Sequence, residues 1–561
     1  MSRAAKKRAK KNKKKMLPDV ADFQKRPAEV SKADDEGLPT KKPKLEDGDL
    51  AKYPTKAVKP APGENVFDDT SDEEGDEAAD ANDADQKTES TATLESSYNL
   101  SLPNKSLTEI LMMDPVEDEE KKSLISNLSA TQRASCLFQA IINLITLDKF
   151  YKEYWEKKPL LIRAKENKQR FKNLLSLESI RKMSKDHHLY YARDLNVTKY
   201  KKGKDGVKRR VTLDKLPRDD SSDGVLVDPV ELWSNYDNGC TVRLLCPHKH
   251  SDNVHALLST LKLELQCMVG ANAYLTPPKS SQGFAPHYDD IEAFCLQLEG
   301  SKRWKVYEPT MVLPRVSLED FTPEDIEGKT PIMDVTLEEG DLLYMPRGWI
   351  HQACTLQDDN EHSLHLTISA MQQWAWVDLL DMLMPEALEN AAMSETSTSL
   401  REGLPQGFLE YMGAMYEEPN DEKLPESLKK VAEEDEVQKL QRALQEKFCG
   451  DAKKRIMKVA KAAYEMIDVA CDQLAKRFMS DRQPFALTKP EKQQTSKSDE
   501  SGAQDKEIMP NTLCQLVQPG VARLILEDDK AIVYHCGDNS RDYHGTPFET
   551  REIHFHGCIE L

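Results

Sequence analysis

Two histidines and one aspartate in the middle of the chain have the residue types and the spacing of a metal site. One residue separates His287 from Asp289, and His351 follows sixty-four positions after His287. Two imidazoles and one carboxylate can hold one face of an Fe(II) ion, which leaves other positions open for a co-substrate and dioxygen. The three residues therefore predict iron-dependent oxygenase chemistry.

The spacing of His287 and Asp289 is weak evidence by itself, because short motifs arise by chance. The same spacing occurs at residues 250–252, a His-Ser-Asp sequence in a polar run, which we interpret as a solvated turn. His287 instead follows a turn-rich stretch and leads into residues 294–298, where apolar side chains alternate with Cys295 and Gln297. This alternation predicts a half-buried strand, and the context favours His287 and Asp289 as ligands.

A lysine follows the first two candidate ligands. We predict a hairpin turn at residues 300–301, after which Lys302 shares one strand face with Trp304 and Val306. An ammonium buried among apolar groups is costly unless an anion meets it, and the distal carboxylate of 2-oxoglutarate would provide that anion. The alternative interpretation is an ordinary hairpin lysine in solvent.

The third candidate ligand belongs to a second segment. Residues 340–345 predict a turn and a short strand, and Pro346 to Gly348 predict a tight bend that presents His351. Hydroxyl groups of Tyr274, and of Thr367 on a predicted strand at 364–369, would add donors to the same anion.

These segments together resemble the JmjC-type, cupin-barrel Fe(II) and 2-oxoglutarate oxygenases, and among them the ribosomal oxygenases with a long N-terminal extension. The resemblance covers most of the chain after about residue 100. The motifs that carry it are residues 150–162, 272–287, 304–309 and 340–351, with Gly283-Phe284-Ala285-Pro286-His287-Tyr288-Asp289-Asp290-Ile291-Glu292 the most specific run.

The resemblance implies an α+β fold, in which a JmjC cupin (double-stranded β-helix) barrel with flanking helices follows a disordered N-terminal tail. A helical dimerisation domain and a C-terminal winged-helix-like module, which we expect to be partial, complete it. The expected boundaries are 1–99 for the tail, 100–375 for the catalytic domain, 376–485 for the helical domain, 486–508 for a linker and 509–561 for the last module.

The resemblance also implies an activity: hydroxylation of the β-carbon of a histidine in a large-subunit ribosomal protein. Demethylation of histone H3 lysines, with a role in transcription, is attributed to the same family. By carry-over, iron is bound by His287, Asp289 and His351; 2-oxoglutarate is held by Lys302 and Tyr274; and the pocket is lined by Asn272, Thr367 and Ser369. The alternative is a catalytically silent chromatin- or RNA-associated protein that binds peptides.

Composition limits the class of protein. The 561 residues carry a net charge of −19, 39% of them are hydrophobic, and no apolar run is long enough to cross a membrane. The basic start is not followed by the apolar core of a secretory signal. The eleven cysteines include no Cys-x-x-Cys pair, which favours a reducing compartment.

Two further regions of the chain suggest its location and its assembly. A basic block at residues 3–15 and a second at 41–44 suit nuclear import or RNA contact, and an acidic run follows at 68–85. We therefore expect a nuclear, nucleolar protein. Helical periodicity at 374–389 and 435–479 predicts amphipathic helices, either an ordinary helical subdomain or, as the resemblance favours, a homodimerisation module.

Overall fold

The computed structural model describes residues 106–112, 128–142, 145–165, 167–215, 224–318, 320–358, 360–416, 436–488, 491–492, 516, 518–527, 530–541 and 553–554. The predicted tail at 1–99, with its basic and acidic blocks, lies outside these residues, as does most of the predicted linker. No described helix combines the length and the apolar character that a membrane crossing requires.

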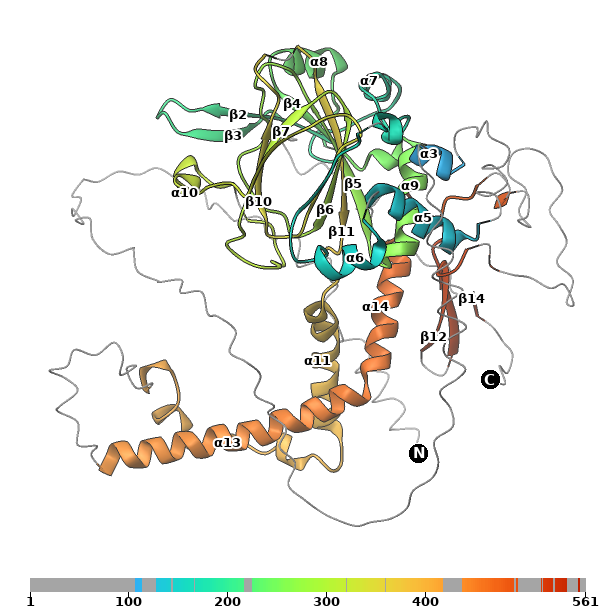
Figure 1. The fold of residues 1–561 in the computed structure, drawn as a ribbon. Helices are drawn as coiled ribbons and strands as arrows, with labels where there is room; N and C mark the ends of the chain where they lie inside the picture. Colours follow the sequence, from blue (N-terminus) through green and yellow to red (C-terminus); the bar gives the residue numbers. More distant parts are fainter. Residues whose placement is uncertain are drawn as a thin grey trace, which may run out of the picture. The chain divides into compact units, whose positions relative to one another are not determined.

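Two antiparallel sheets form the centre of residues 160–370 (Figure 1). The larger has the strand order β1-β9-β6-β11-β5-β4-β2-β3, and the smaller has the order β10-β7-β8. The strands are β1 (Leu160–Ile162), β2 (Leu195–Lys202), β3 (Lys208–Thr212), β4 (Thr241–Leu245), β5 (Val269–Thr276), β6 (Glu292–Glu299), β7 (Lys302–Tyr307), β8 (Met333–Leu337), β9 (Leu342–Met345), β10 (Ile350–Cys354) and β11 (Ser363–Ala370).

Helices flank these sheets, as the predicted JmjC barrel fold requires. They are α3 (Leu107–Ile110), α5 (Ala130–Ile142), α6 (Leu147–Glu153), α7 (Leu177–Asp186), α8 (Pro229–Asp237), α9 (Asp252–Leu265) and α10 (Pro323–Ile326), with short 3-10 turns η2 (Lys168–Phe171) and η3 (Pro247–Lys249). Thr146 caps the N-terminus of α6 and Ser251 that of α9, each by accepting a hydrogen bond from a first-turn amide.

Strand β6 is buried on both faces, so the prediction of a half-buried strand was wrong. The Phe294 ring lies 5.7 Å from that of Phe138 on α5 and 6.1 Å from that of Phe150 on α6. On the opposite face, Cys295 points into the space between the two sheets. Helices cover the outer face, and this packing fixes the strand that leads away from Asp289.

The predicted hairpin at residues 300–301 was also wrong. Strands β6 and β7 belong to different sheets, so these residues carry the chain from the larger sheet to the smaller. Gly300 has a φ of +62°, and a Cβ there would lie 1.9 Å from the carbonyl oxygen of His362. Only glycine fits this crossing. It places Lys302 at the start of β7, facing the larger sheet.

The predicted helices beyond the barrel are present. They are α11 (Trp376–Met393), α13 (Glu436–Glu465) and α14 (Ile467–Asp481), with 3-10 turns η4 (Thr398–Leu400), η5 (Phe408–Glu410) and η6 (Ala414–Tyr416). Helix α11 packs on α13 and α14 through a cluster that includes Leu383, Ala387, Val459 and Ala463.

A third sheet closes the described chain. Its strands β12 (Ala522–Glu527), β13 (Lys530–His535) and β14 (Ile553–His554) are antiparallel. Ile525, Ile532 and Tyr534 of this sheet form a buried cluster with Met479 of α14. The sheet therefore packs on the end of the helical region.

Candidate active site

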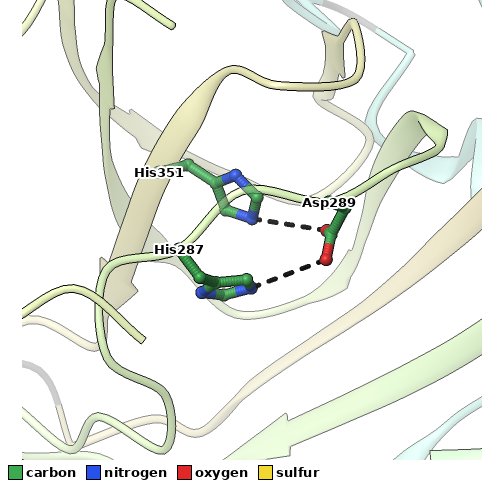
Figure 2. Close-up of side chains that lie close together, drawn as sticks. All are labelled: His287, Asp289 and His351. Carbon is green, nitrogen blue, oxygen red and sulfur yellow. Dashed lines mark ion pairs between the residues drawn. The ribbon is translucent and has the colours of Figure 1, made fainter. Parts of the chain in front are cut away.

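The structure brings His287, Asp289 and His351 together, and Figure 2 shows their side chains converging on one point. The Nε2 atom of His287 lies 3.9 Å from one Asp289 carboxylate oxygen, and that of His351 lies 3.7 Å from the other. One ligand atom from each residue falls within 4.8 Å of the others. Among the described residues, no other group of three His, Cys, Asp or Glu side chains meets this condition.

The backbones of the two histidines are joined directly. The amide of His287 donates to the carbonyl of His351 at 3.1 Å, and the amide of His351 donates to the carbonyl of His287 at 2.8 Å. His351 lies on β10 in the smaller sheet, whereas His287 lies in the segment that joins β5 to β6 of the larger sheet. This pair of hydrogen bonds fixes the ligands relative to each other.

Each histidine ring is oriented by a carbonyl two residues earlier. The Nδ1 atom of His287 lies 2.8 Å from the oxygen of Ala285, and that of His351 lies 3.0 Å from the oxygen of Trp349. A carbonyl can only accept, so each Nδ1 carries the proton and each Nε2 is left with its lone pair toward Asp289. Burial lowers the pKa of His351, which keeps this ring neutral. Neutral imidazoles are the form that binds a metal.

The bend before His351 also holds Asp289. The amide of Gly348 donates to the carbonyl of Asp289 at 2.9 Å. Gly348 has a φ of +91°, and a Cβ at this position would lie 2.4 Å from the carbonyl oxygen of Met311. The predicted bend at residues 346–348 is present, and it positions both later ligands.

A buried polar cluster lies beside the bend. Glu292 accepts a hydrogen bond from the Tyr344 hydroxyl, and the guanidinium of Arg347 lies 3.6 Å from the same carboxylate. Arg347 also pairs with Glu156. Burial raises the pKa of Glu292 to about 7, against the hydrogen bond from Tyr344 and the charge of Arg347. The cluster joins the start of β6 to the bend that presents His351.

Lys302 lies in the same cavity as the three candidate ligands. Its side chain is 5% exposed, and its ammonium donates to the Thr276 hydroxyl at 2.9 Å. Burial lowers the pKa of Lys302 to about 8, and no described carboxylate forms an ion pair with it. The inward orientation inferred from strand alternation is correct, and the cavity presents a cation that lacks an anionic partner.

Two further polar atoms in this cavity are buried without a hydrogen-bond partner: Nε1 of Trp304 and Nδ1 of His365. The His365 ring stacks on that of Tyr274 at 4.8 Å, and burial lowers its pKa strongly. No sequence pattern singled out His365 as a site residue. Its position could have indicated the site, because it lies two residues before Thr367 on β11 and therefore faces the same side of the sheet.

The remaining predicted pocket residues divide into two groups. Tyr274 and Thr367 line the cavity, and the Thr367 hydroxyl lies 3.6 Å from the Cys295 sulfur. Asn272 and Ser369 are on the same strand faces, on β5 and β11, but do not line it. Asn272 lies before Tyr274 on β5, and Ser369 lies after Thr367 on β11, so both are displaced toward the same end of these antiparallel strands.

The second His-x-Asp sequence has a structural role. Ser251 is the N-cap of α9 and Asp252 its first residue, so the segment is a helix start rather than the solvated turn that we predicted. The His250 ring stacks on that of His187 at 4.3 Å, and both line a separate surface hollow. Asp252 is acidic in the first turn, where the helix dipole favours it.

Two family models match the chain. The JmjC domain model matches residues 243–379, which contain all of the candidate site. The model of the ribosomal oxygenase 1 C-terminal winged helix domain matches residues 483–558. The second match covers the described sheet of β12, β13 and β14.

Curated relatives match over most of the chain. Ribosomal oxygenase 1 of Danio rerio is 36% identical over 426 residues, which cover 74% of this chain and 70% of the relative. The bifunctional lysine-specific demethylase and histidyl-hydroxylase NO66 of Aedes aegypti is 38% identical over 417 residues, 72% of this chain. The chain spans 59% of that relative and 56% of its Culex quinquefasciatus counterpart.

Solved structures show a more distant similarity. The X-ray structure of E. coli ycfD is 14% identical, with a TM-score of 0.36, over 70% of this chain and 85% of that chain. The E. coli ribosomal oxygenase YcfD in complex with cobalt and 2-oxoglutarate gives a TM-score of 0.35 with the same coverage and identity.

Proposed function

The chain belongs to the JmjC-domain ribosomal oxygenase family, and on this basis we propose that it is an Fe(II)- and 2-oxoglutarate-dependent protein oxygenase. The substrate that we propose is a histidine of a large-subunit ribosomal protein, hydroxylated at its β-carbon. One observation carries the proposal: the cluster of His287, Asp289 and His351 shares its cavity with Lys302, a buried cation without a carboxylate partner.

The residues fit the metal and the co-substrate. Two neutral imidazoles and a carboxylate on one side suit Fe(II). In the same cavity, Nε1 of Trp304 and Nδ1 of His365 are buried without hydrogen-bond partners, which a bound co-substrate could provide. When bound, iron would supply the redox centre at which one oxygen atom enters the substrate C–H bond and the other enters succinate, while 2-oxoglutarate releases carbon dioxide.

The protein's own groups then bind and orient. Lys302 would hold the distal carboxylate of 2-oxoglutarate through a charge-assisted hydrogen bond, with Thr276 fixing the ammonium. Tyr274 and Thr367 would add hydroxyl groups along the same anion. The carbonyls of Ala285 and Trp349 hold the histidine rings in the tautomer that presents Nε2 to the metal.

Demethylation of histone H3 lysines is the second candidate activity. The name of the Aedes aegypti relative includes both a lysine-specific demethylase and a histidyl-hydroxylase. Both reactions oxidise a carbon–hydrogen bond beside the same three ligands, so residues at the cavity entrance must select the substrate. Regulation of transcription would follow from the demethylase activity, and a role in ribosome biogenesis from the hydroxylase.

The charge of the N-terminal residues and the exposed apolar side chains support a proposal for the protein's location and its assembly. We propose a nuclear, nucleolar protein, because the basic block at residues 3–15 suits import and contact with RNA, and ribosomal proteins assemble where RNA is dense. We also propose a homodimer. Large apolar side chains remain exposed along α11 and α13: Trp376, Leu380, Leu440, Ile456, Met457 and Tyr464.

Mass spectrometry tests the activity directly. The full chain, reconstituted with Fe(II), 2-oxoglutarate and dioxygen, is incubated separately with ribosomal proteins and with methylated histone H3 peptides. A gain of one oxygen on a histidine of a ribosomal protein is the expected result. Loss of methyl groups from H3 alone would transfer the function to demethylation.

Two alanine variants complete this experiment. His287→Ala should lose turnover while its circular dichroism stays unchanged. His250→Ala removes the histidine of the other His-x-Asp sequence and should retain full activity. An active His287→Ala protein would overturn the site, and no change in either substrate pool would favour the silent peptide-binding alternative.

A further inference from the structure

Strands β2 and β3 continue past the rest of the larger sheet as a two-stranded ribbon (Figure 1). Strand β2 pairs with β4 only over residues 195–198, and beyond them its only strand partner in the described chain is β3. Residues 199–210 contain seven Lys or Arg side chains and a single Asp, in a chain whose net charge is −19. No step of the proposed oxygenase reaction uses this ribbon.

Most of the positive charge on the ribbon is not neutralised. The turn holds its own carboxylate, since Asp205 accepts a hydrogen bond from the Val207 amide at 3.1 Å and pairs with Arg209 at 2.6 Å. Four exposed lysines of the ribbon have no ion-pair partner within the described residues: Lys201, Lys202, Lys204 and Lys208.

One face of the ribbon combines cations with an aromatic ring. Lys202 lies directly opposite Lys208, and Tyr200 directly opposite Arg210, so alternation places all four on the same face. The Lys208 ammonium lies 5.9 Å from the centre of the Tyr200 ring, and Arg210 pairs with Asp320 at 3.0 Å. Like charges directly opposite each other destabilise a sheet. Protection of the edge strand β3 from other chains would not require cations on β2 as well.

The same face is connected to the candidate active site. The Tyr200 amide donates to the carbonyl of Gln282 at 2.7 Å, and the Arg210 guanidinium lies 5.7 Å from the centre of the Phe284 ring. Phe284 lines the cavity of the candidate ligands, and its ring lies 6.2 Å from that of His287. The ribbon face therefore continues from the wall of the active-site cavity.

We propose that the ribbon face, made of Tyr200, Lys202, Lys208 and Arg210, binds RNA that accompanies the ribosomal-protein substrate. The cations would meet phosphates, and the Tyr200 ring would stack on a base. A bound polyanion would also remove the repulsion between Lys202 and Lys208.

The choice of RNA rests on the proposed function. Proteins that bind RNA do so through clustered cations of their own, so a basic ribbon repels such a substrate and attracts the RNA attached to it. An acidic peptide would match the charge of the lysines but would leave the aromatic ring without a role. RNA held on the ribbon face brings the attached protein to the cavity.

The test measures RNA binding by the full chain. Fluorescence anisotropy with a labelled single-stranded RNA is recorded over a salt series, and wild-type protein should bind saturably. The double variant Lys202→Gln/Lys208→Gln should bind less tightly. The slope of log K against log salt should become shallower by about 1.4, because about 0.7 is lost with each phosphate contact.

A matched variant and a direct map distinguish the ribbon from the rest of the chain. Lys447→Gln/Lys453→Gln removes the same charge from exposed positions on α13 and should keep the wild-type slope. The basic block at residues 3–15 is present in every variant, so its contribution is common to all of them. Ultraviolet crosslinking of wild-type protein to RNA, followed by mass spectrometry of peptides, should place crosslinks within residues 199–210.

Four results would each overturn the proposal. They are the absence of saturable RNA binding by wild-type protein, equal slopes for wild type and Lys202→Gln/Lys208→Gln, crosslinks found only outside the ribbon, and tighter binding of a polyglutamate peptide than of RNA. If the double variant does not fold by circular dichroism, the crosslinks of wild type still decide. These measurements need neither iron nor turnover, so their failure would leave the proposed oxygenase activity standing.

Discussion

Lys302 shows how one side chain can indicate a ligand that the structure does not contain. It is buried, it faces the cavity of the candidate ligands, and its only described hydrogen-bond partner is the neutral hydroxyl of Thr276. A neutral partner compensates a buried ammonium poorly. A buried lysine at this position therefore implies an anionic ligand.

Replacing Lys302 should act on the co-substrate rather than on the fold. We expect Lys302→Met to raise the KM for 2-oxoglutarate by about 10- to 100-fold, since hydrogen bonds to charged groups contribute about 1.5–3 kcal/mol. Tm without co-substrate should be unchanged or higher, because an unpaired buried charge is removed. Initial rates over a 2-oxoglutarate series measure this effect.

Lys305→Met is the matched control for Lys302. It lies on the opposite face of β7, is 39% exposed, and has Asp334 as an ion-pair partner at 4.0 Å. Its KM for 2-oxoglutarate should equal that of wild type. If Lys302→Met also kept the wild-type KM, the assignment of Lys302 to the co-substrate carboxylate would be wrong.

Glu292 should make stability depend on pH. Its pKa is raised from 4.5 to about 7 in the folded chain, so the folded state binds the proton more tightly than the unfolded state. The contribution of this group is fully present below about pH 4.5 and is lost as the pH rises through about 7. The change is on the order of a few kcal/mol.

Urea unfolding between pH 5.5 and 8.5 checks this prediction. The free energy of unfolding of wild type should fall with rising pH relative to Glu292→Gln, which cannot ionise at this position. Parallel pH profiles for the two proteins would show that Glu292 does not titrate in this range.

For individual residues, the sequence predicted those whose type is unusual for an ordinary strand. His287, Asp289, His351 and Lys302 were found because a ligand triad or an inward lysine differs from an ordinary strand. His365 was missed because a lone histidine on a strand is usually structural, and only the stacking on Tyr274 and the orphaned Nδ1 distinguish it.

Among the elements, the bend at residues 346–348 has the most direct effect on the site. Gly348 combines a left-handed φ with a close approach to Met311, and its amide holds the Asp289 carbonyl. Gly328 has a similar φ of +79° but no atom within 4 Å of an added Cβ. Comparing substitutions at the two glycines therefore separates the cost of the left-handed backbone from the cost of a steric contact.

We expect Gly328→Ala to cost about 1 kcal/mol, the usual penalty for a left-handed conformation in a residue with a Cβ. Gly348→Ala should cost more, by about 1–3 kcal/mol as for overpacked positions, and should weaken metal binding. Urea unfolding and titration with Mn(II) as a probe measure both effects. Equal losses in the two variants would show that the contact with Met311 relaxes freely.

Element types were predicted better than their partners. Alternation identified the strands at 294–298 and 302–306, but period two does not say which sheet a strand joins. The crossing at Gly300 depends on the approach of His362, sixty-two residues later, which no local pattern reports. For the same reason, alternation could not show that α5 and α6 cover the outer face of β6.

For the whole molecule, the homodimer is the main prediction. Met457 and Tyr464 lie two helical turns apart on α13 and are 56% and 78% exposed. Replacing both with glutamate should convert the dimer to a monomer, because charged groups in an apolar interface are left desolvated. Light scattering after size exclusion gives the mass. Lys447→Glu is the control, and a monomeric wild type would contradict the prediction.

The crossed amide–carbonyl hydrogen bonds between His287 and His351 have a consequence for iron supply. Backbone hydrogen bonds, and not metal coordination alone, close the sixty-four-residue loop between these ligands, so part of the entropy of assembling the site is lost on folding. We therefore expect iron to be a late and replaceable component. A cell short of iron would hold an inactive but folded pool, ready to resume turnover when the metal returns, without new synthesis.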